Sequence, residues 1–133
     1  MINKIEHIGI AVADLKKSED LFEKLLGKKP YKKEEVASEG VVTSFFKIGN
    51  QKIELLKGNN SGSSIQKFIE KRKEGVHKIA MHVDSIQKEV ERLENLGFEF
   101  ISTIPKKGAD NKMIVFLHPK TTNGVLVELC EDI

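Results

Sequence analysis

The sequence is poor in cysteine and in the large aromatic residues, because its 133 residues include one cysteine, no tryptophan and one tyrosine. Cys130 has no second cysteine with which to form an internal disulfide, as is typical of the reducing cytoplasm. No apolar run approaches the roughly 20 residues that a membrane-spanning helix needs. The first residues lack the basic and apolar segments of a signal peptide. These absences predict a cytoplasmic protein with no membrane partner.

The sequence also lacks an excess of charge of one sign. Lys and Arg number 22, Asp and Glu number 20, and the formal net charge is +2. This balance provides no field that would favour nucleic acid or an anionic membrane as a partner. A chain of 133 residues is long enough for one packed core and too short to require a second domain. We therefore expect residues 1–133 to form a single domain that has no nucleic-acid partner.

Apolar spacing in the first part of the chain predicts a strand, a helix and three further strands. An extended run covers residues 5–12, helical spacing covers residues 15–26, and Gly27 is placed to end the helix. Three extended runs follow, at residues 31–36, 41–48 and 52–56. A Gly-Asn pair between the last two is a hairpin signal. Residues 1–58 are therefore predicted to form a βαβββ module.

The second part of the chain repeats this order after a linker. Residues 59–75 are typical of a flexible loop followed by a helix that begins at Ser63 or Ser64. A strand, a helix and three strands are predicted next, at residues 77–83, 85–97, 98–104, 113–118 and 124–129. Residues 76–133 thus form a second predicted βαβββ module. Duplicated units usually pack as a pseudo-symmetric pair, so we expect an α+β fold with a cupped mixed sheet around a metal or ligand cleft.

The first strand of each module has one bulky face and one face of small and polar residues. In the first module, alternation puts Ile8, Ile10 and Val12 on one face and His7, Gly9 and Ala11 on the other. In the second module it puts Ile79, Met81 and Val83 on one face and Lys78, Ala80 and His82 on the other. The bulky face suits packing against a helix. Small residues on a core face would leave volume unfilled, at about 2–5 kcal/mol for each large-to-small position. The second face therefore predicts a ligand cavity, with His7 and Lys78 at equivalent positions.

The last strand of each module carries one carboxylate between apolar neighbours. Glu54 in "KIELL" and Glu128 in "VLVELC" are charged residues in mid-strand, where an isolated charge needs a partner or a metal. Together with His7 and Lys78 they form a set of four positions related by the repeat. Imidazole nitrogen and carboxylate oxygen suit divalent ions such as Co, Ni, Zn, Mn or Mg. Lysine does not ligate unless it is deprotonated.

Four stretches carry a resemblance to a known family: "HIGIAVADL", "IELL", "SIQKFIEKRKEGVHKIAMHVDSI" and "FLHPKTTNGVLVELCE". With the double βαβββ pattern, they resemble the vicinal oxygen chelate superfamily, also called the glyoxalase fold, and within it the methylmalonyl-CoA epimerases. In that family a first-strand His, a Gln or Glu in the fourth strand, the second His of a His-His-Ile-Ala sequence and a final-strand Glu hold a divalent metal. The matching residues are His7, Glu54, Lys78 and Glu128, so the resemblance implies His7, Glu54 and Glu128 as metal ligands.

The reaction that the resemblance implies is a 1,1-proton transfer at the carbon α to a thioester. It proceeds through an enolate that the metal stabilises, and it needs two acid/base groups on opposite faces of the substrate. Glu128 matches one of these groups, and Lys78 would serve as the other. The implied substrate is an acyl-CoA thioester, whose phosphates would meet three loop lysines, Lys106, Lys107 and Lys120.

Lys78 is the departure from the family pattern. His77 is adjacent, but strand alternation points it to the opposite face. His82 has the right alternation but lies about 13 Å along the strand, at roughly 3.3 Å per residue. Three interpretations remain: a metal held by three protein ligands, a metal-free site in which Lys78 supplies the positive charge, and a binding protein without catalysis. In the second, Lys78 would neutralise much of the repulsion between Glu54 and Glu128.

Two other functions remain open on the same fold. Lactoylglutathione lyase, or glyoxalase I, uses a His, Glu, His, Glu ligand set, and Glu54 fits that set as well as it fits the epimerase. A non-catalytic small-molecule-binding member of the fold is favoured by Lys78. Family relatives often dimerise, so a homodimer is expected.

Overall fold

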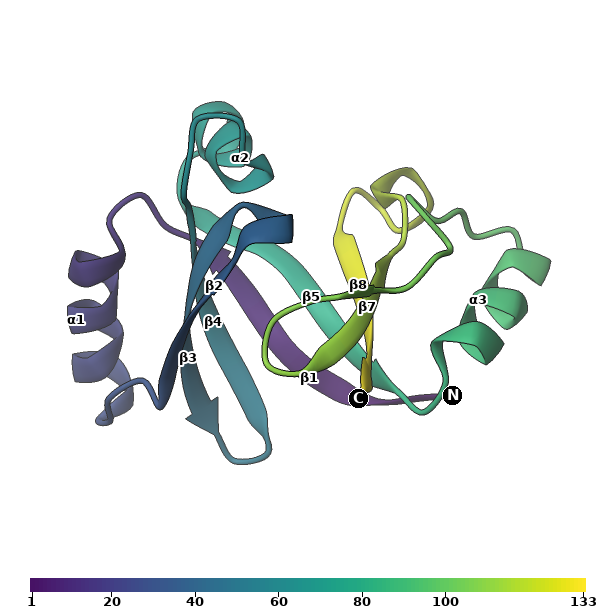
Figure 1. The fold of residues 1–133 in the computed structure, drawn as a ribbon, viewed down its shortest axis with the longest axis horizontal. Coiled ribbons are helices and arrows are strands. Elements are labelled where there is room, and N and C mark those ends of the chain that lie inside the picture. The colour runs from purple at the N-terminus through teal and green to yellow at the C-terminus, as the bar shows by residue number, and fades with distance from the viewer. The chain divides into compact units, whose positions relative to one another are not determined.

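The structure of the chain, a computed structural model, describes all residues from Met1 to Ile133. Figure 1 follows the chain through its helices and strands. The first module consists of β1 (Ile2–Ala11), α1 (Leu15–Leu26), β2 (Lys32–Val36), the short 3-10 helix η1 (Ala37–Glu39), β3 (Val41–Ile48) and β4 (Gln51–Gly58). The linker helix is α2 (Ser64–Arg72). The second module consists of β5 (Gly75–Val83), α3 (Ile86–Asn95), β6 (Lys106–Lys107), β7 (Lys112–Phe116), the 3-10 helix η2 (Pro119–Thr121) and β8 (Leu126–Asp132).

Both modules arrange their four strands in the same order. The first has the order β2-β3-β4-β1 and the second has the order β6-β7-β8-β5. Strand β3 is antiparallel to both of its neighbours, β2 and β4. Strand β8 is antiparallel to β7 and parallel to β5. The predicted α+β class with two βαβββ modules is confirmed, and the shared order is what a duplicated unit would produce.

The chain packs into two compact units, which are described separately. Unit 1 comprises Met1–His7 and Lys78–Ile133, and unit 2 comprises Ile8–His77. Strand β1 contributes its first part to unit 1 and its last part to unit 2. His7 and Lys78 are therefore the terminal residues of the two segments that make up unit 1.

The core of unit 2 lies between α1 and one face of its strands. Helix α1 begins at Asp14, whose side chain accepts a hydrogen bond from the Lys17 N–H at 3.0 Å. It ends at Gly27, which has the left-handed conformation that a helix end of this type requires (φ +71°). The core is formed by Val12, Leu15, Phe46 and Leu55, with Ile10, Phe22, Leu26, Val42 and Ile53 packed around it. The predicted bulky face of the first strand thus packs against the helix.

The core of unit 1 repeats this arrangement with α3. Its buried members are Val83, Ile86, Val90, Leu93, Val115, Leu117 and Leu129. Met81 packs against this core, whereas Ala80 belongs to a separate apolar group with Ile114, Cys130 and Phe116. Adjacent residues of β5 therefore face opposite sides of the sheet, as the alternation predicts. The second face, which carries Ala80, also carries the candidate site.

The prediction of a strand at residues 98–104 is wrong. Only Phe100 forms a bridge, to Leu117, and the edge strand β6 consists of two residues. The Ser102 hydroxyl accepts a hydrogen bond from the Ile104 N–H at 3.2 Å, which is a local turn. Pro105 follows and has no N–H to give to a ladder. Local bonding and proline therefore outweigh the extended preference of this segment.

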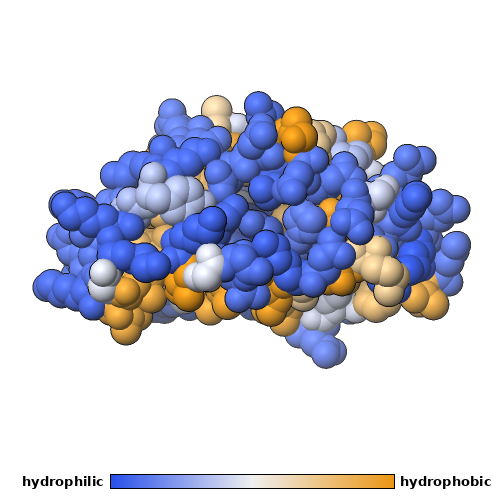
Figure 2. All heavy atoms as spheres, turned by 90° about the horizontal axis from the view of Figure 1, so that it is seen from below, coloured by the Kyte–Doolittle hydropathy of each residue, from blue (hydrophilic) through white to orange (hydrophobic).

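On the face drawn in Figure 2, apolar side chains form separate patches among hydrophilic ones. Exposed apolar residues include Leu21 and Leu25 of α1, which are 62% and 70% exposed. No helix of the structure has the length and apolar character needed to cross a membrane.

Candidate active site

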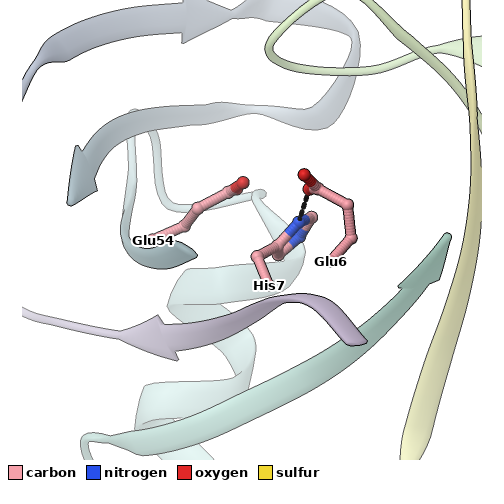
Figure 3. Close-up of side chains that lie close together, drawn as sticks. All are labelled: Glu6, His7 and Glu54. Carbon is pink, nitrogen blue, oxygen red and sulfur yellow. Dashed lines mark hydrogen bonds and ion pairs between the residues drawn. The ribbon is translucent and has the colours of Figure 1, made fainter. Parts of the chain in front are cut away.

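His7 lies near the middle of β1 and is buried. Its Nδ1 atom is 2.7 Å from Glu6 Oε1, as Figure 3 shows. An ionised carboxylate can only accept a hydrogen bond, so with Glu6 ionised the Nδ1 atom carries the hydrogen and donates it. In the neutral imidazole, Nε2 is then the nitrogen with a lone pair. The Glu6 contact thus fixes both the orientation of the ring and the nitrogen that is available for chemistry.

Glu128 is one of the buried carboxylates of unit 1. It lies in β8, 2% exposed, and its nearest strand partner in β5 is Ala80. The Lys78 ammonium donates a hydrogen bond to Glu128 Oε1 at 2.6 Å, and the same oxygen is 3.9 Å from His7 Nε2. Three of the four predicted site residues therefore lie together, because Lys78 and His7 both approach the Oε1 atom of Glu128. The contact with Glu128 is one of the two that the metal-free interpretation expects for Lys78.

Phe116 completes this group on the same face. It pairs with Glu128 across β7 and β8, and the Lys78 Nζ atom lies 5.6 Å from the centroid of its ring. Lys106 approaches the same ring, at 5.9 Å. Ammonium groups at these distances are attracted by the ring quadrupole. Phe116 thus adds a contact that favours the charged form of Lys78 at this position.

Glu54 belongs to unit 2, where it is 2% exposed. It lies opposite Phe45 in the β3–β4 ladder. Its neighbours Ile53 and Leu55 pack in the α1 core, so the Glu54 side chain is on the other face of the strand. This placement agrees with the predicted second face. A role for Glu54 as a metal ligand with His7 and Glu128 stays a prediction.

The two hydroxyl residues of β3 point to different sides. Ser44 faces α1 and donates a hydrogen bond to the buried Glu19 carboxylate at 2.8 Å. Thr43 lies on the face of Phe45, with which Glu54 pairs. Ser44 therefore serves the core of unit 2, and only Thr43 shares a face with Glu54.

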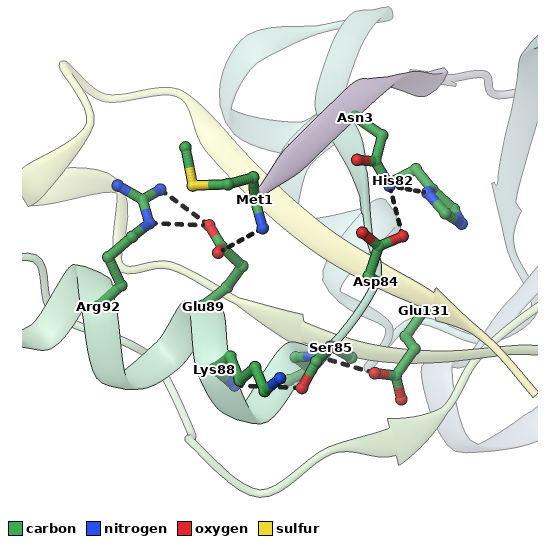
Figure 4. A network of polar contacts seen from close by, with 10 residues as sticks. Met1, Asn3, His82, Asp84, Ser85, Lys88, Glu89, Arg92 and Glu131 are labelled. Atoms are coloured by element: carbon green, nitrogen blue, oxygen red, sulfur yellow. Dashed lines mark hydrogen bonds and ion pairs between the residues drawn. The ribbon is translucent and has the colours of Figure 1, made fainter.

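The other histidines do not replace the missing ligand. His77 packs edge-on against Phe68 of α2, with ring centroids 4.9 Å apart, which agrees with its predicted orientation away from Lys78. His82 accepts a hydrogen bond from Asn3 and its Nε2 atom lies 3.3 Å from Asp132. Figure 4 shows His82 beside Asn3 and Asp84.

His118 has a local structural role. It caps η2, where its Nδ1 atom accepts from the Lys120 N–H at 3.2 Å. This contact holds the turn that follows β7.

Glu6 and Phe116 are site neighbours that sequence reasoning did not identify. Strict alternation places Glu6 on the face opposite His7, yet the two side chains bond to each other. The available signal is the charge itself, since Glu6 is an acidic residue within a predicted strand, as Glu54 is. Phe116 has no such signal, because a strand phenylalanine is the commonest of core residues.

Comparison with known proteins assigns the family. The model of the Glyoxalase/Bleomycin resistance protein/Dioxygenase superfamily matches residues 6–116. The chain belongs to this superfamily. The match begins in β1 of the first module and ends with β7 of the second, so it includes parts of both modules.

Two relatives of this superfamily member align along almost its whole length. The uncharacterized protein YqjC of Bacillus subtilis (strain 168) is 36% identical over 130 residues, which cover 98% of this chain and 93% of that protein. The mitochondrial methylmalonyl-CoA epimerase of Dictyostelium discoideum is 40% identical over 131 residues, covering 98% of this chain and 79% of that protein.

Solved structures of epimerases share the fold of this superfamily member. Methylmalonyl-CoA epimerase from Mycobacterium tuberculosis superposes with a TM-score of 0.95 at 29% identity, covering 99% of this chain and 89% of that one. A methylmalonyl-CoA epimerase in complex with methylmalonyl-CoA and NH4+ superposes with a TM-score of 0.94 at 29% identity, covering 99% and 96% of the two chains.

The donor set of unit 1 does not fit the divalent ion that the family resemblance implies. His7 Nε2 and Glu128 Oε1 are suitable ligand atoms, but the third position holds Lys78, whose ammonium has three donors and no acceptor. That ammonium already occupies Glu128 Oε1 at 2.6 Å. A divalent ion bound to the same oxygen would have to displace it or lie against a like charge. We therefore derive no catalytic step through a metal.

Proposed function

We propose that the protein is an epimerase that transfers the proton on the carbon between a thioester and a carboxylate, with methylmalonyl-CoA or a close homologue as substrate. The observation that carries this proposal is the full-length similarity to methylmalonyl-CoA epimerases, 40% identity over 98% of the chain in one case. The buried Glu128–Lys78 pair offers a carboxylate base and a positive charge for such a reaction.

Glu128 is the proposed acid/base. The hydrogen between the two carbonyl groups is acidic, and its removal by a Glu128 oxygen leaves an enolate on the thioester. Return of a proton from solvent to the other face of that carbon gives the epimer, Glu128 releases the first proton to solvent, and no electrons are lost or gained. A buried carboxylate next to the reacting carbon is suited to this transfer, which typically contributes about 10²–10⁴-fold in rate.

Lys78 is the proposed electrostatic partner. Negative charge develops on the thioester oxygen in the transition state, and a positioned ammonium stabilises that charge. Lys78 Nζ lies 2.6 Å from Glu128 Oε1, so both side chains would approach the substrate from one side. Lys78 is therefore better suited to hold the enolate charge than to act as the base on the opposite face.

The acyl-CoA tail would contact the cationic groups beside this pair. Lys106 lies over Phe116, on the face that carries Glu128. Lys120, by contrast, forms an ion pair with Glu99 at 3.0 Å. Lys106 is therefore the favoured phosphate contact of the lysines predicted for this role.

A substrate panel tests the proposed function. Purified protein is incubated with (R)- and (S)-methylmalonyl-CoA and, separately, with the hemithioacetal of methylglyoxal and glutathione. The proposed epimerase should interconvert the two CoA esters and should not turn over the hemithioacetal. Turnover of the hemithioacetal alone would indicate a lactoylglutathione lyase, and ligand binding without any turnover would indicate a binding protein.

The predicted homodimer is a separate proposal. Light scattering during gel filtration of the full chain measures its mass directly. A mass near twice the 15.0 kDa of one chain would agree with it, and a mass of one chain would contradict it.

A further inference from the structure

Lys78 occupies the position that the internal repeat and the family pattern give to histidine. Its side chain is 13% exposed, and its ammonium lies 2.6 Å from the buried Glu128 carboxylate. We propose that this ammonium replaces the bound cation, so that the site of this chain works without a divalent metal. The activity part of this proposal rests on the proposed function, whereas its metal-binding part does not.

The surroundings of Lys78 favour a permanent positive charge. Glu128 provides an opposite charge in direct contact, and the Phe116 ring lies 5.6 Å from the Nζ atom. The pair also satisfies the carboxylate, which as an isolated buried ion would be costly. A divalent ion at Glu128 would lose this arrangement and face the repulsion of the ammonium. The cation of this site is thus the Lys78 ammonium, which is part of the chain.

The number of ligands points in the same direction. Protein sites for Zn²⁺ and similar ions use at least three protein ligands. In unit 1 the Glu128 oxygen has an imidazole nitrogen 3.9 Å away on one side and an ammonium on the other. A histidine at position 78 would add a ligand atom to His7 Nε2 and Glu128 Oε1, whereas the Lys78 ammonium adds none. The Glu6 carboxylate is bound to the other ring nitrogen of His7.

An ammonium ion is present in one solved complex of a related epimerase, which also contains methylmalonyl-CoA. Lys78 carries the same chemical group on a side chain. Its N–H groups can donate to a thioester oxygen as the negative charge develops, while the proton stays on nitrogen.

Cobalt binding tests the proposal without reference to activity. Wild type, Lys78→His and Lys78→Met are purified without chelator, dialysed, and titrated with Co²⁺ while visible absorption and bound metal are measured. We expect no stoichiometric Co²⁺ in wild type and one Co²⁺ per chain in Lys78→His, with affinity raised at least about 10-fold. One tightly bound Co²⁺ per chain in wild type, at the affinity of Lys78→His, would overturn the proposal.

Activity provides the second measurement. We expect wild-type epimerisation to be unchanged by EDTA, and that of Lys78→His to be lost in EDTA and restored by Co²⁺. Wild-type activity that disappears in EDTA and returns with Co²⁺ would contradict the proposal. If wild type does not epimerise at all, the proposed function fails, and the Co²⁺ titration still decides whether Lys78 excludes the metal. Thermal melts confirm that each variant folds, and the wild-type titration stands even where a variant does not.

Discussion

At the scale of single residues, the account depends on the contact between Lys78 and Glu128. Sequence reasoning could predict it, because the repeat identified both positions and opposite charges on one face attract. It could not predict that Glu6 would orient His7, since alternation separates neighbouring side chains. The Lys106 contact with Phe116 was equally hidden, because it depends on the packing of β6 against β7.

Removal of the Lys78 charge should destabilise the fold. Lys78→Met leaves the buried Glu128 carboxylate without its ammonium, and breaking a buried pair typically costs about 3–5 kcal/mol. Because Lys78 is 13% exposed, we expect the lower end, about 3 kcal/mol, in urea unfolding at neutral pH. The matched control is Lys120→Met, whose ion pair with Glu99 is exposed and should contribute less than about 1 kcal/mol. Equal losses in both variants would show that the Lys78 contact is not a buried pair.

Lys106 should affect substrate binding and not chemistry. If its ammonium meets a CoA phosphate, Lys106→Gln should raise KM for methylmalonyl-CoA about 2- to 5-fold, as expected for a partly exposed ion pair. The value of kcat should stay constant, because the lost contact would stabilise the bound substrate and the transition state equally. Steady-state kinetics of Lys106→Gln are compared with those of the control variant Lys120→Gln. An unchanged KM would remove Lys106 from the binding site.

At the scale of elements, the helices were predictable and the sixth strand was not. Each helix begins at a residue whose side chain accepts from the backbone of its first turn: Asp14, Ser63 and Ser85. These signals are local and survive in any tertiary context. Strand β6 is an edge strand, and such strands depend on the neighbour with which they pair. Its extent was therefore not readable from the apolar pattern of residues 98–104.

Helix α3 should make stability depend on pH through Glu89. The hydrogen bond from Arg92, at 2.8 Å, is the largest cause that holds the pKa of Glu89 below its usual value, and the amino group of Met1 acts in the same direction (Figure 4). A depressed carboxyl pKa stabilises the fold above the unfolded-state pKa, and this contribution is lost as pH falls through the folded-state pKa. Glu89→Gln should therefore lower the free energy of unfolding by about 1–2 kcal/mol at pH 7.

The pH profile provides the check on Glu89. Urea unfolding of wild type and Glu89→Gln should give curves that differ at pH 7 and converge below the usual carboxyl range near pH 4. A difference that stays constant with pH would mean that the variant disturbs packing and not the charge of Glu89.

At the scale of the whole molecule, duplication explains why so much of the fold was readable. Two modules with the same strand order place equivalent strands in equivalent environments, so each half of the sequence informs the other. The same comparison exposed Lys78, because a repeat shows what a position is expected to hold.

Exchange of the α-proton of methylmalonyl-CoA into D2O, followed by NMR, tests the central claim most directly. We predict that EDTA-treated wild type catalyses this exchange and that Glu128→Gln slows it about 10²–10⁴-fold, the usual contribution of an acid/base group. Rapid exchange by wild type that Glu128→Gln leaves unchanged would contradict the assignment of Glu128. No exchange by wild type, with or without added Co²⁺, would contradict the proposed function itself.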